Sequence, residues 1–235
     1  MSGSIRLFVQ QPLAAGATFD ADPPQAHYLG NVMRLAAGDT LVLFNGRDGE
    51  FQSRIETLHR EHLRLRVQYL LRPQSPDPDL WLAFAMLKRN ATDLLVEKAT
   101  ELGVSALLPV LTERTIVHRV NLGRLTAIAI EAAEQCERLT IPELHAPQRL
   151  AEMLASWPSQ RPLFVAMERS AAPPIRPALG PAALLVGPEG GFTPGELDAL
   201  SAHPFVTGVT LGPRILRAET ACIAGLALLQ APANG

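Results

Sequence analysis

The chain turns twice on glycine near its C-terminus, at Leu185-Val186-Gly187-Pro188-Glu189-Gly190-Gly191-Phe192 and at Leu211-Gly212-Pro213-Arg214-Ile215-Leu216-Arg217-Ala218-Glu219-Thr220-Ala221. Each turn follows an apolar run, 182–186 or 206–211, that predicts a buried strand, and each precedes a helical pattern. Both turns therefore belong at carboxyl ends of strands, where open α/β sheets bind ligands. The two turns predict an α/β domain with one small-molecule site.

Strand-like and helix-like segments alternate upstream of these turns. The pattern predicts strands over 81–87, 106–111 and 162–167 and helices over 92–102, 121–138 and 150–156. Such alternation predicts a mostly parallel sheet with helices on both faces. The capping box Thr193-Pro194-Gly195-Glu196 marks the start of a further helix.

A second domain is predicted at the N-terminus. Short β-like segments occupy 40–44, 50–55 and 62–69, with hairpin signals at Asn45-Gly46. They predict a small β-barrel or sandwich. Residues 72–79 hold three prolines and no apolar side chain, which indicates a stiff linker. The predicted organisation is a β domain over 1–72, a linker over 73–79 and the α/β domain over 80–235.

Composition narrows the class of protein. The 235 residues are 47% hydrophobic and 19% charged, as expected for a globular protein. No apolar stretch approaches the roughly 20 residues that span a bilayer, and no secretory segment opens the chain, so we expect no membrane association. Cys136 and Cys222 lie far apart, which indicates no metal site and a reducing cytoplasm. The net charge of −2 argues weakly against nucleic-acid binding.

The first turn lacks the fingerprints of phosphate-binding loops. It matches neither GxGxxG nor GxxxxGK[ST], and Glu189 places a carboxylate where a phosphate cradle needs N–H donors. A ligand without phosphate fits better, and S-adenosylmethionine, with its adenine, ribose and sulfonium cation, is a reasonable candidate. The alternative is that the glycines only make a tight turn, with Glu189 exposed or capping a helix.

The second turn carries two arginines, Arg214 and Arg217, before Glu219 and Thr220 enter the last helix. If the turn is helical, the three-residue spacing puts both guanidinium groups on one side. The pair then indicates an anionic substrate. Solvated surface arginines are the alternative.

Together the turns resemble the last two motifs of the RsmE family of ribosomal RNA methyltransferases, in the SPOUT superfamily. Further family-like features are Arg6, Phe8, His27-Tyr28-Leu29, Val32-Met33-Arg34, 98–104, Glu113-Arg114, 131–135 and Arg138. The resemblance covers nearly the whole chain. It departs at Leu125, usually tryptophan in the family, and at Glu137, which replaces a small or neutral residue beside Arg138.

The resemblance implies a PUA-like β-barrel that helps to bind RNA and an α/β SPOUT domain with a deep trefoil knot. It implies a homodimer that uses S-adenosylmethionine to methylate N3 of a uridine in 16S ribosomal RNA of the small subunit. Two alternatives stay open. One is a SPOUT methyltransferase acting on another RNA site, such as a ribose 2′-hydroxyl, and the other is a non-catalytic RNA-binding ribosome-assembly factor.

The resemblance also implies roles for single residues. The cofactor would contact Met167, Leu185, Val186, Gly187, Pro188, Glu189, Gly190, Gly191, Leu211, Gly212, Ile215, Leu216 and Ala221, mainly through backbone atoms. For the mechanism, the N3 proton of uridine must leave and charge builds on the flanking carbonyl oxygens. We therefore hypothesise that Arg217 or Arg214 binds the uracil oxygens or an adjacent phosphate, while Glu189 or Glu219 is the candidate general base. The predicted RNA contacts are Arg6, His27, Arg34 and Arg138.

Overall fold

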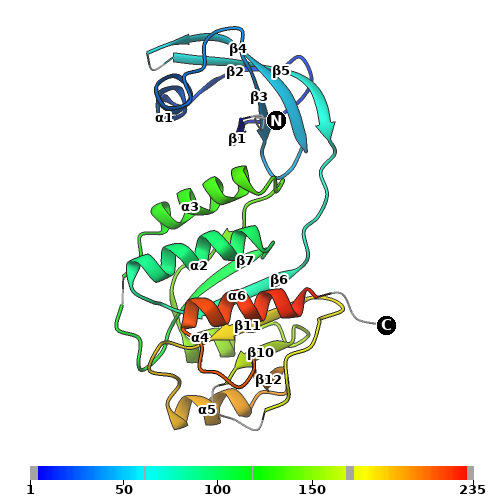
Figure 1. Cartoon of the computed structure of the whole chain (residues 1–235). Helices are drawn as coiled ribbons and strands as arrows, with labels where there is room; N and C mark the ends of the chain where they lie inside the picture. Colours follow the sequence, from blue (N-terminus) through cyan, green and yellow to red (C-terminus); the bar gives the residue numbers. More distant parts are fainter. Residues whose placement is uncertain (1–4, 61, 118, 168–171, 232–235) are drawn as a thin grey trace. The chain divides into compact units, whose positions relative to one another are not determined.

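The structure is a computed structural model that describes residues 5–60, 62–117, 119–167 and 172–231 (Figure 1). The chain forms two compact units, one made of Met1–Pro76 and Ala133–Ile141 and the other of Asp77–Ala132 and Pro142–Gly235. Residues 133–141, which the sequence pattern placed in the α/β domain, thus belong to the first unit. The reason is non-local contacts of this segment, described below.

The first unit is built on one five-stranded sheet. Its elements are β1 (Arg6–Phe8), β2 (Thr18–Ala21), α1 (Pro23–His27), the π-helical turn η1 (Tyr28–Val32), β3 (Thr40–Phe44), β4 (Glu50–His59) and β5 (His62–Arg72). The strand order is β1-β3-β4-β5-β2, with β1 parallel to β3 and the other pairs antiparallel. Because β1 and β2 end this order, pairing among the described strands does not close the sheet into a barrel.

Local chemistry explains the β3–β4 hairpin that the sequence predicts. Gly46 and Gly49 have φ of +78° and +97°, a region that side chains with a Cβ rarely adopt. The Oδ1 atom of Asn45 accepts the backbone N–H groups of Arg47 and Asp48. The turn is therefore closed by residues suited to left-handed backbone.

The second unit is a parallel sheet with helical crossovers. Its elements are β6 (Leu80–Ala85), α2 (Arg89–Glu101), β7 (Ala106–Leu111), α3 (Leu122–Gln135), β8 (Glu143–Leu144), β9 (Gln148–Arg149), α4 (Leu150–Ala155), β10 (Leu163–Ala166), β11 (Ala182–Val186), α5 (Pro194–Ser201), β12 (Val206–Val209) and α6 (Ala218–Leu229). The last three residues of α3 belong to the first unit. The strand order is β12-β10-β11-β6-β7-β8, with β9 also on β7, and every pair is parallel. The predicted alternation and parallel sheet are confirmed.

Both faces of this sheet are buried, as continuous apolar strands require. Leu82 and Leu184 pack with residues of α2, α3 and α6 on one face, while Ala83 and Leu185 pack with α4 and Leu200 of α5 on the other. A Cβ on Gly225 would lie 2.6 Å from Leu184 Cδ2, so glycine lets α6 approach β11 closely. None of the described helices is long and apolar enough to cross a membrane.

Candidate active site

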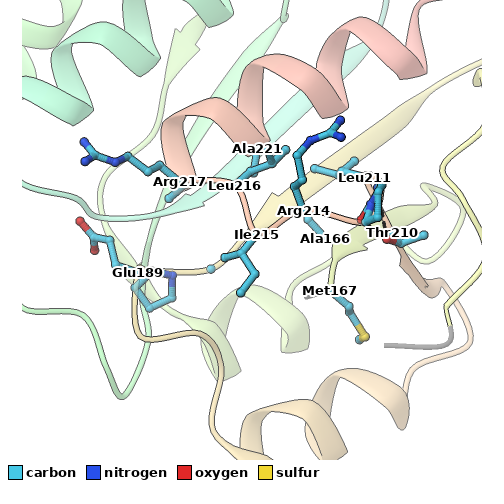
Figure 2. Close-up of a pocket in the computed structure, with 15 residues that line it drawn as sticks. Ala166, Met167, Glu189, Thr210, Leu211, Arg214, Ile215, Leu216, Arg217 and Ala221 are labelled. Atoms are coloured by element: carbon cyan, nitrogen blue, oxygen red, sulfur yellow. Dashed lines mark hydrogen bonds between the residues drawn. The ribbon is translucent and has the colours of Figure 1, made fainter. Parts of the chain in front are cut away.

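A cavity of about 610 Å³ opens at the carboxyl ends of the neighbouring strands β10, β11 and β12 (Figure 2). It is lined by Ala166, Met167, Gly187, Pro188, Glu189, Thr210, Leu211, Gly212, Pro213, Arg214, Ile215, Leu216, Arg217, Ala218 and Ala221. Both glycine turns quoted above contribute to its wall. The predicted convergence of the turns on one pocket is therefore seen in the structure.

The first turn leaves β11 at Val186 and is held by tight packing. A Cβ on Gly187 would lie 2.9 Å from the Phe192 ring, and Gly191, with φ of +66°, donates its N–H to the Pro188 carbonyl at 2.8 Å. Both positions therefore favour glycine.

Two side chains from elsewhere clamp the same turn. Arg114 Nη1 donates to the Gly190 carbonyl at 2.7 Å. The buried Glu196 carboxylate accepts the N–H of Thr193 at 2.9 Å and, through its other oxygen, the N–H of Glu113 at 2.8 Å. Thr193 Oγ1 in turn accepts the Glu196 N–H, so the predicted capping box is confirmed. Glu196 thus joins the start of α5 to the loop after β7.

The second turn is held at its start and passes through Gly212 in a backbone conformation that favours glycine. Thr210 donates its N–H to the Pro173 carbonyl and accepts the N–H of Ile175. Gly212 has φ of +120°, and its N–H bonds to Thr210 Oγ1. The backbone from 213 to 217 is not helical, and α6 begins only at Ala218. The helical turn that would pair the two arginines is therefore absent.

The apolar groups of the cavity form its wall, and the charged side chains of Arg217 and Glu189 lie to one side of it (Figure 2). Met167, Leu211, Leu216 and Ala221 provide apolar wall, and peptide groups of both turns provide donors and acceptors. In Figure 2, Arg217 and Glu189 point to one side of the cavity, whereas Arg214 points away from them. Such a site can hold a flat apolar group on one wall and a polar group at its mouth.

Glu219 is not among the residues that line the cavity. It lies in the first turn of α6, where its charge contributes, after burial, to a raised pKa of the Cys222 thiol. That thiol is fully buried, so it does not act as a nucleophile. Of the two predicted bases, only Glu189 therefore faces the cavity.

The remaining residues of the first turn lie around the cavity. Leu185 and Val186 are buried in β11 and do not line it. Gly190 and Gly191 line an adjoining cavity of about 260 Å³ together with Arg114. The sequence motifs missed Thr210 as a lining residue and Arg114 as a clamp, since neither lies in a recognisable turn signal.

Two residues that we predicted to contact RNA, Arg6 and Arg138, are buried in the first unit. Arg6 is buried, and its guanidinium donates to Glu50 Oε1 at 2.7 Å and to the carbonyls of Ala133 and Arg138, each at 2.7 Å. Arg138 is also buried, with Nη2 bonded to Thr140 Oγ1. These side chains are engaged inside the protein, so neither presents its charge to RNA. They also explain why 133–141 belongs to the first unit.

The two other predicted RNA contacts are accessible. His27 ends α1 and is exposed, and Arg34 is exposed with φ of +57°. Neither is near the cavity residues in sequence. Among the described residues, no group of three or more His, Cys, Asp or Glu side chains is placed to hold a metal ion.

Two family models match the chain. Residues 73–230 match the model described as an RNA methyltransferase domain, and residues 21–68 match an RNA methyltransferase PUA domain. The ribosomal RNA small subunit methyltransferase E of Rickettsia conorii is 34% identical over 94% of this chain and 93% of its own length. That of Bacillus subtilis is 28% identical over 95% of each chain.

Solved structures give the same result. A methyltransferase from Legionella pneumophila, determined with its cofactor S-adenosylmethionine bound, is 31% identical with a TM-score of 0.88, over 97% of this chain and 98% of its own. A ribosomal RNA small subunit methyltransferase E from Neisseria gonorrhoeae, bound to S-adenosyl methionine, is 29% identical with a TM-score of 0.88, over 96% of each chain. With both domains matched along nearly the full length, the chain belongs to the ribosomal RNA small subunit methyltransferase E family of RNA methyltransferases.

Proposed function

We propose that this protein transfers a methyl group from S-adenosylmethionine to N3 of a uridine in 16S ribosomal RNA of the small subunit. The observation that carries the proposal is the cavity at the ends of β10, β11 and β12, where apolar wall and peptide groups adjoin Arg217 and Glu189. Relatives of this chain are named as methyltransferases of small-subunit ribosomal RNA, and two similar solved structures contain S-adenosylmethionine.

The residues of the cavity fit S-adenosylmethionine. A volume of about 610 Å³ lies in the range of small-molecule pockets. Met167, Leu211 and Leu216 offer apolar surface for an adenine ring, and the backbone of Gly187–Glu189 and Leu211–Gly212 offers partners for polar edges. The carboxylate of Glu189 suits a ligand with a sulfonium cation. When bound, this cofactor supplies an activated methyl group.

The protein side chains then have two tasks. Uridine N3 carries a proton that must leave, and negative charge builds on the two flanking carbonyl oxygens as it does. Glu189 at the cavity mouth is the group that accepts the proton, and Arg217 stabilises the charge on the oxygens. Arg214, which points away from them, contacts a neighbouring phosphate. Glu219 is the second choice as base because it does not face the cavity.

The same proposal includes the finer architecture of the family. We infer that the C-terminal segment forms a trefoil knot of the SPOUT type. In support, the segment before β11 bonds to Thr210 through Pro173 and Ile175 and to Leu229 through Ala178, so it lies against both the second turn and the end of α6.

We also infer a cytoplasmic homodimer, and the 54% exposure of Ile215 at the cavity is consistent with a covering partner or ligand. His27 and Arg34 remain proposed RNA contacts.

The product nucleoside tests the activity. The chain is expressed in a strain that lacks its own uridine-N3 methyltransferase, and nucleosides from its small-subunit RNA are measured by mass spectrometry. N3-methyluridine is the expected product. A ribose-methylated nucleoside would instead identify a related enzyme with another target, and absence of both product and cofactor binding would identify a non-catalytic assembly factor.

Cofactor binding depends on the backbone at Gly212. Gly212→Ala should weaken S-adenosylmethionine binding by about tenfold, because alanine at φ of +120° costs about 1–3 kcal/mol and the turn must shift to relieve it. Isothermal titration calorimetry measures the affinity. Gly195→Ala is the matched control, since this residue lies in α5 with open space around its Cβ and no positive φ. Unchanged affinity in Gly212→Ala would remove the second turn from the cofactor site.

A further inference from the structure

A second cavity, of about 320 Å³, lies at the end of β6 and is rich in arginine. Its lining residues include Arg89, Thr92, Arg119 and Arg124. Neither the sequence motifs nor the proposed mechanism uses it. Because β6 lies next to β11 and runs parallel to it, this cavity and the larger one open at the same edge of the sheet.

The helix that begins at this cavity has an unusual charge arrangement. α2 has Lys88 as its N-cap residue, with no side-chain cap and no acidic residue in its first turn. Thr92 does not serve as a substitute, since its hydroxyl donates to the Leu87 carbonyl. Helix N-termini carry unpaired N–H groups and partial positive charge, and normally attract Asp or Glu. Here Lys88 and Arg89 add positive charge to that end instead.

In the described part of the chain, an acidic partner neutralises only one of the four cations in this region, Lys88, Arg89, Arg119 and Arg124. Arg124 is paired with Asp93. In the described part of the chain, the side chains of Lys88, Arg89 and Arg119 make no ion pair or hydrogen bond, and all three are exposed. Gathering unpaired cations around a concave surface costs energy unless an anion binds there. Arginine forks and free helix N–H groups together match the oxygens of a phosphate group.

The arginine-rich cavity lies close to the turn that carries Glu189. Neighbouring strands are about 4.8 Å apart, so the edge of β6 is one strand away from the turn that carries Glu189. A nucleic-acid strand carries a phosphate at every nucleotide, so a strand with a base in the larger cavity has backbone phosphates available to a neighbouring cavity. We propose that the cavity formed by Arg89, Arg119 and Arg124 binds a backbone phosphate of the substrate RNA close to the target nucleotide. This inference rests on the proposed function.

RNA affinity of a double variant tests the inference. Arg89→Ala/Arg119→Ala should weaken binding of a small-subunit RNA fragment by about tenfold and make the dependence of log affinity on log salt shallower by about 0.7, the change for loss of one phosphate contact on a single strand. The affinity for S-adenosylmethionine should stay unchanged. Arg89→Lys/Arg119→Lys keeps the charge and should retain most of the RNA affinity.

Arg176→Ala is the matched control, because Arg176 is an exposed arginine of the same unit outside both cavities. Equal RNA affinity and salt dependence for the double alanine variant and the Arg176 control would overturn the inference, as would binding of inorganic phosphate at this site with no change in RNA affinity. If the unmodified protein neither binds nor methylates RNA, the proposed function itself fails. Thermal unfolding of each variant verifies that the fold is intact.

Discussion

Arg217→Ala is expected to lower the rate of methyl transfer by about 10² to 10³-fold, the usual loss when one donor to a developing oxyanion is removed. Arg217 is exposed at the cavity mouth and precedes the first residue of α6, at the positive end of that helix. In the described structure its side chain has no ion pair or hydrogen bond, so its charge is available to substrate. Because Arg217 faces away from the apolar wall, cofactor affinity should change by less than a few-fold.

Single-turnover kinetics at saturating RNA and cofactor measure this rate. Arg214→Ala is the comparison: it removes an arginine three residues away that lines the same cavity but points elsewhere, so the rate constant should fall less and the RNA concentration dependence should change more. Arg217→Lys should recover only part of the rate, because an ammonium group lacks the planar fork. Equal rates for Arg217→Ala and the unmodified protein would exclude Arg217 from the chemistry.

Arg6→Ala is expected to destabilise the first unit by about 1–3 kcal/mol: Arg72 still pairs with Glu50, but the buried groups that Arg6 satisfies lose their donor. Arg6 and Glu50 have side chains only 6% and 8% exposed. The same guanidinium lies 4.3 Å from the Phe44 ring centroid and donates to the Ala133 carbonyl, so alanine also leaves buried acceptors unpaired. Arg54→Ala is the control: Arg54 is an exposed arginine of the same sheet with one bond, to Gly38.

Hydrogen exchange of the β1, β3 and β4 amides measures this loss. Both tryptophans, Trp81 and Trp157, lie in the second unit, so their fluorescence reports that unit separately. We expect faster exchange in the first unit with little change in tryptophan fluorescence. Exchange as slow in Arg6→Ala as in Arg54→Ala would show that the buried pair contributes little.

Acid sensitivity should change in the same variant. Burial by itself raises the pKa of the Glu50 carboxyl, but hydrogen bonds from Arg72 and Arg6 and their positive charges outweigh it, so the pKa lies below its usual 4.5. The pair therefore stabilises the fold above about pH 4.5, and this contribution is lost as pH falls through the lower folded-state pKa. Without Arg6 the pKa of Glu50 rises, so the loss begins at higher pH.

Local patterns were sufficient for much of the fold. The strands Thr40–Phe44, Ala106–Leu111 and Ala182–Val186 begin and end at the predicted residues, because each is an apolar run bounded by turn-forming residues. The start of α5 follows from its capping box in the same way. The two glycine turns located the cavity, since carboxyl ends of parallel strands must meet at one edge.

Side-chain roles needed the tertiary structure. The sequence does not distinguish an arginine that faces RNA from one that pairs with a buried carboxylate. Arg6 bonds to the carboxylate of Glu50, 44 residues away, and to carbonyls more than 120 residues away. The choice between Glu189 and Glu219 likewise depends on which of them faces the cavity. The period of the apolar residues indicates which positions of a helix or strand face the interior. It does not indicate which residues they pack against there. Turns and strands were therefore readable from short stretches of sequence, whereas the partners of Arg6, Arg114 and Glu196 come from distant segments and depend on how the chain folds.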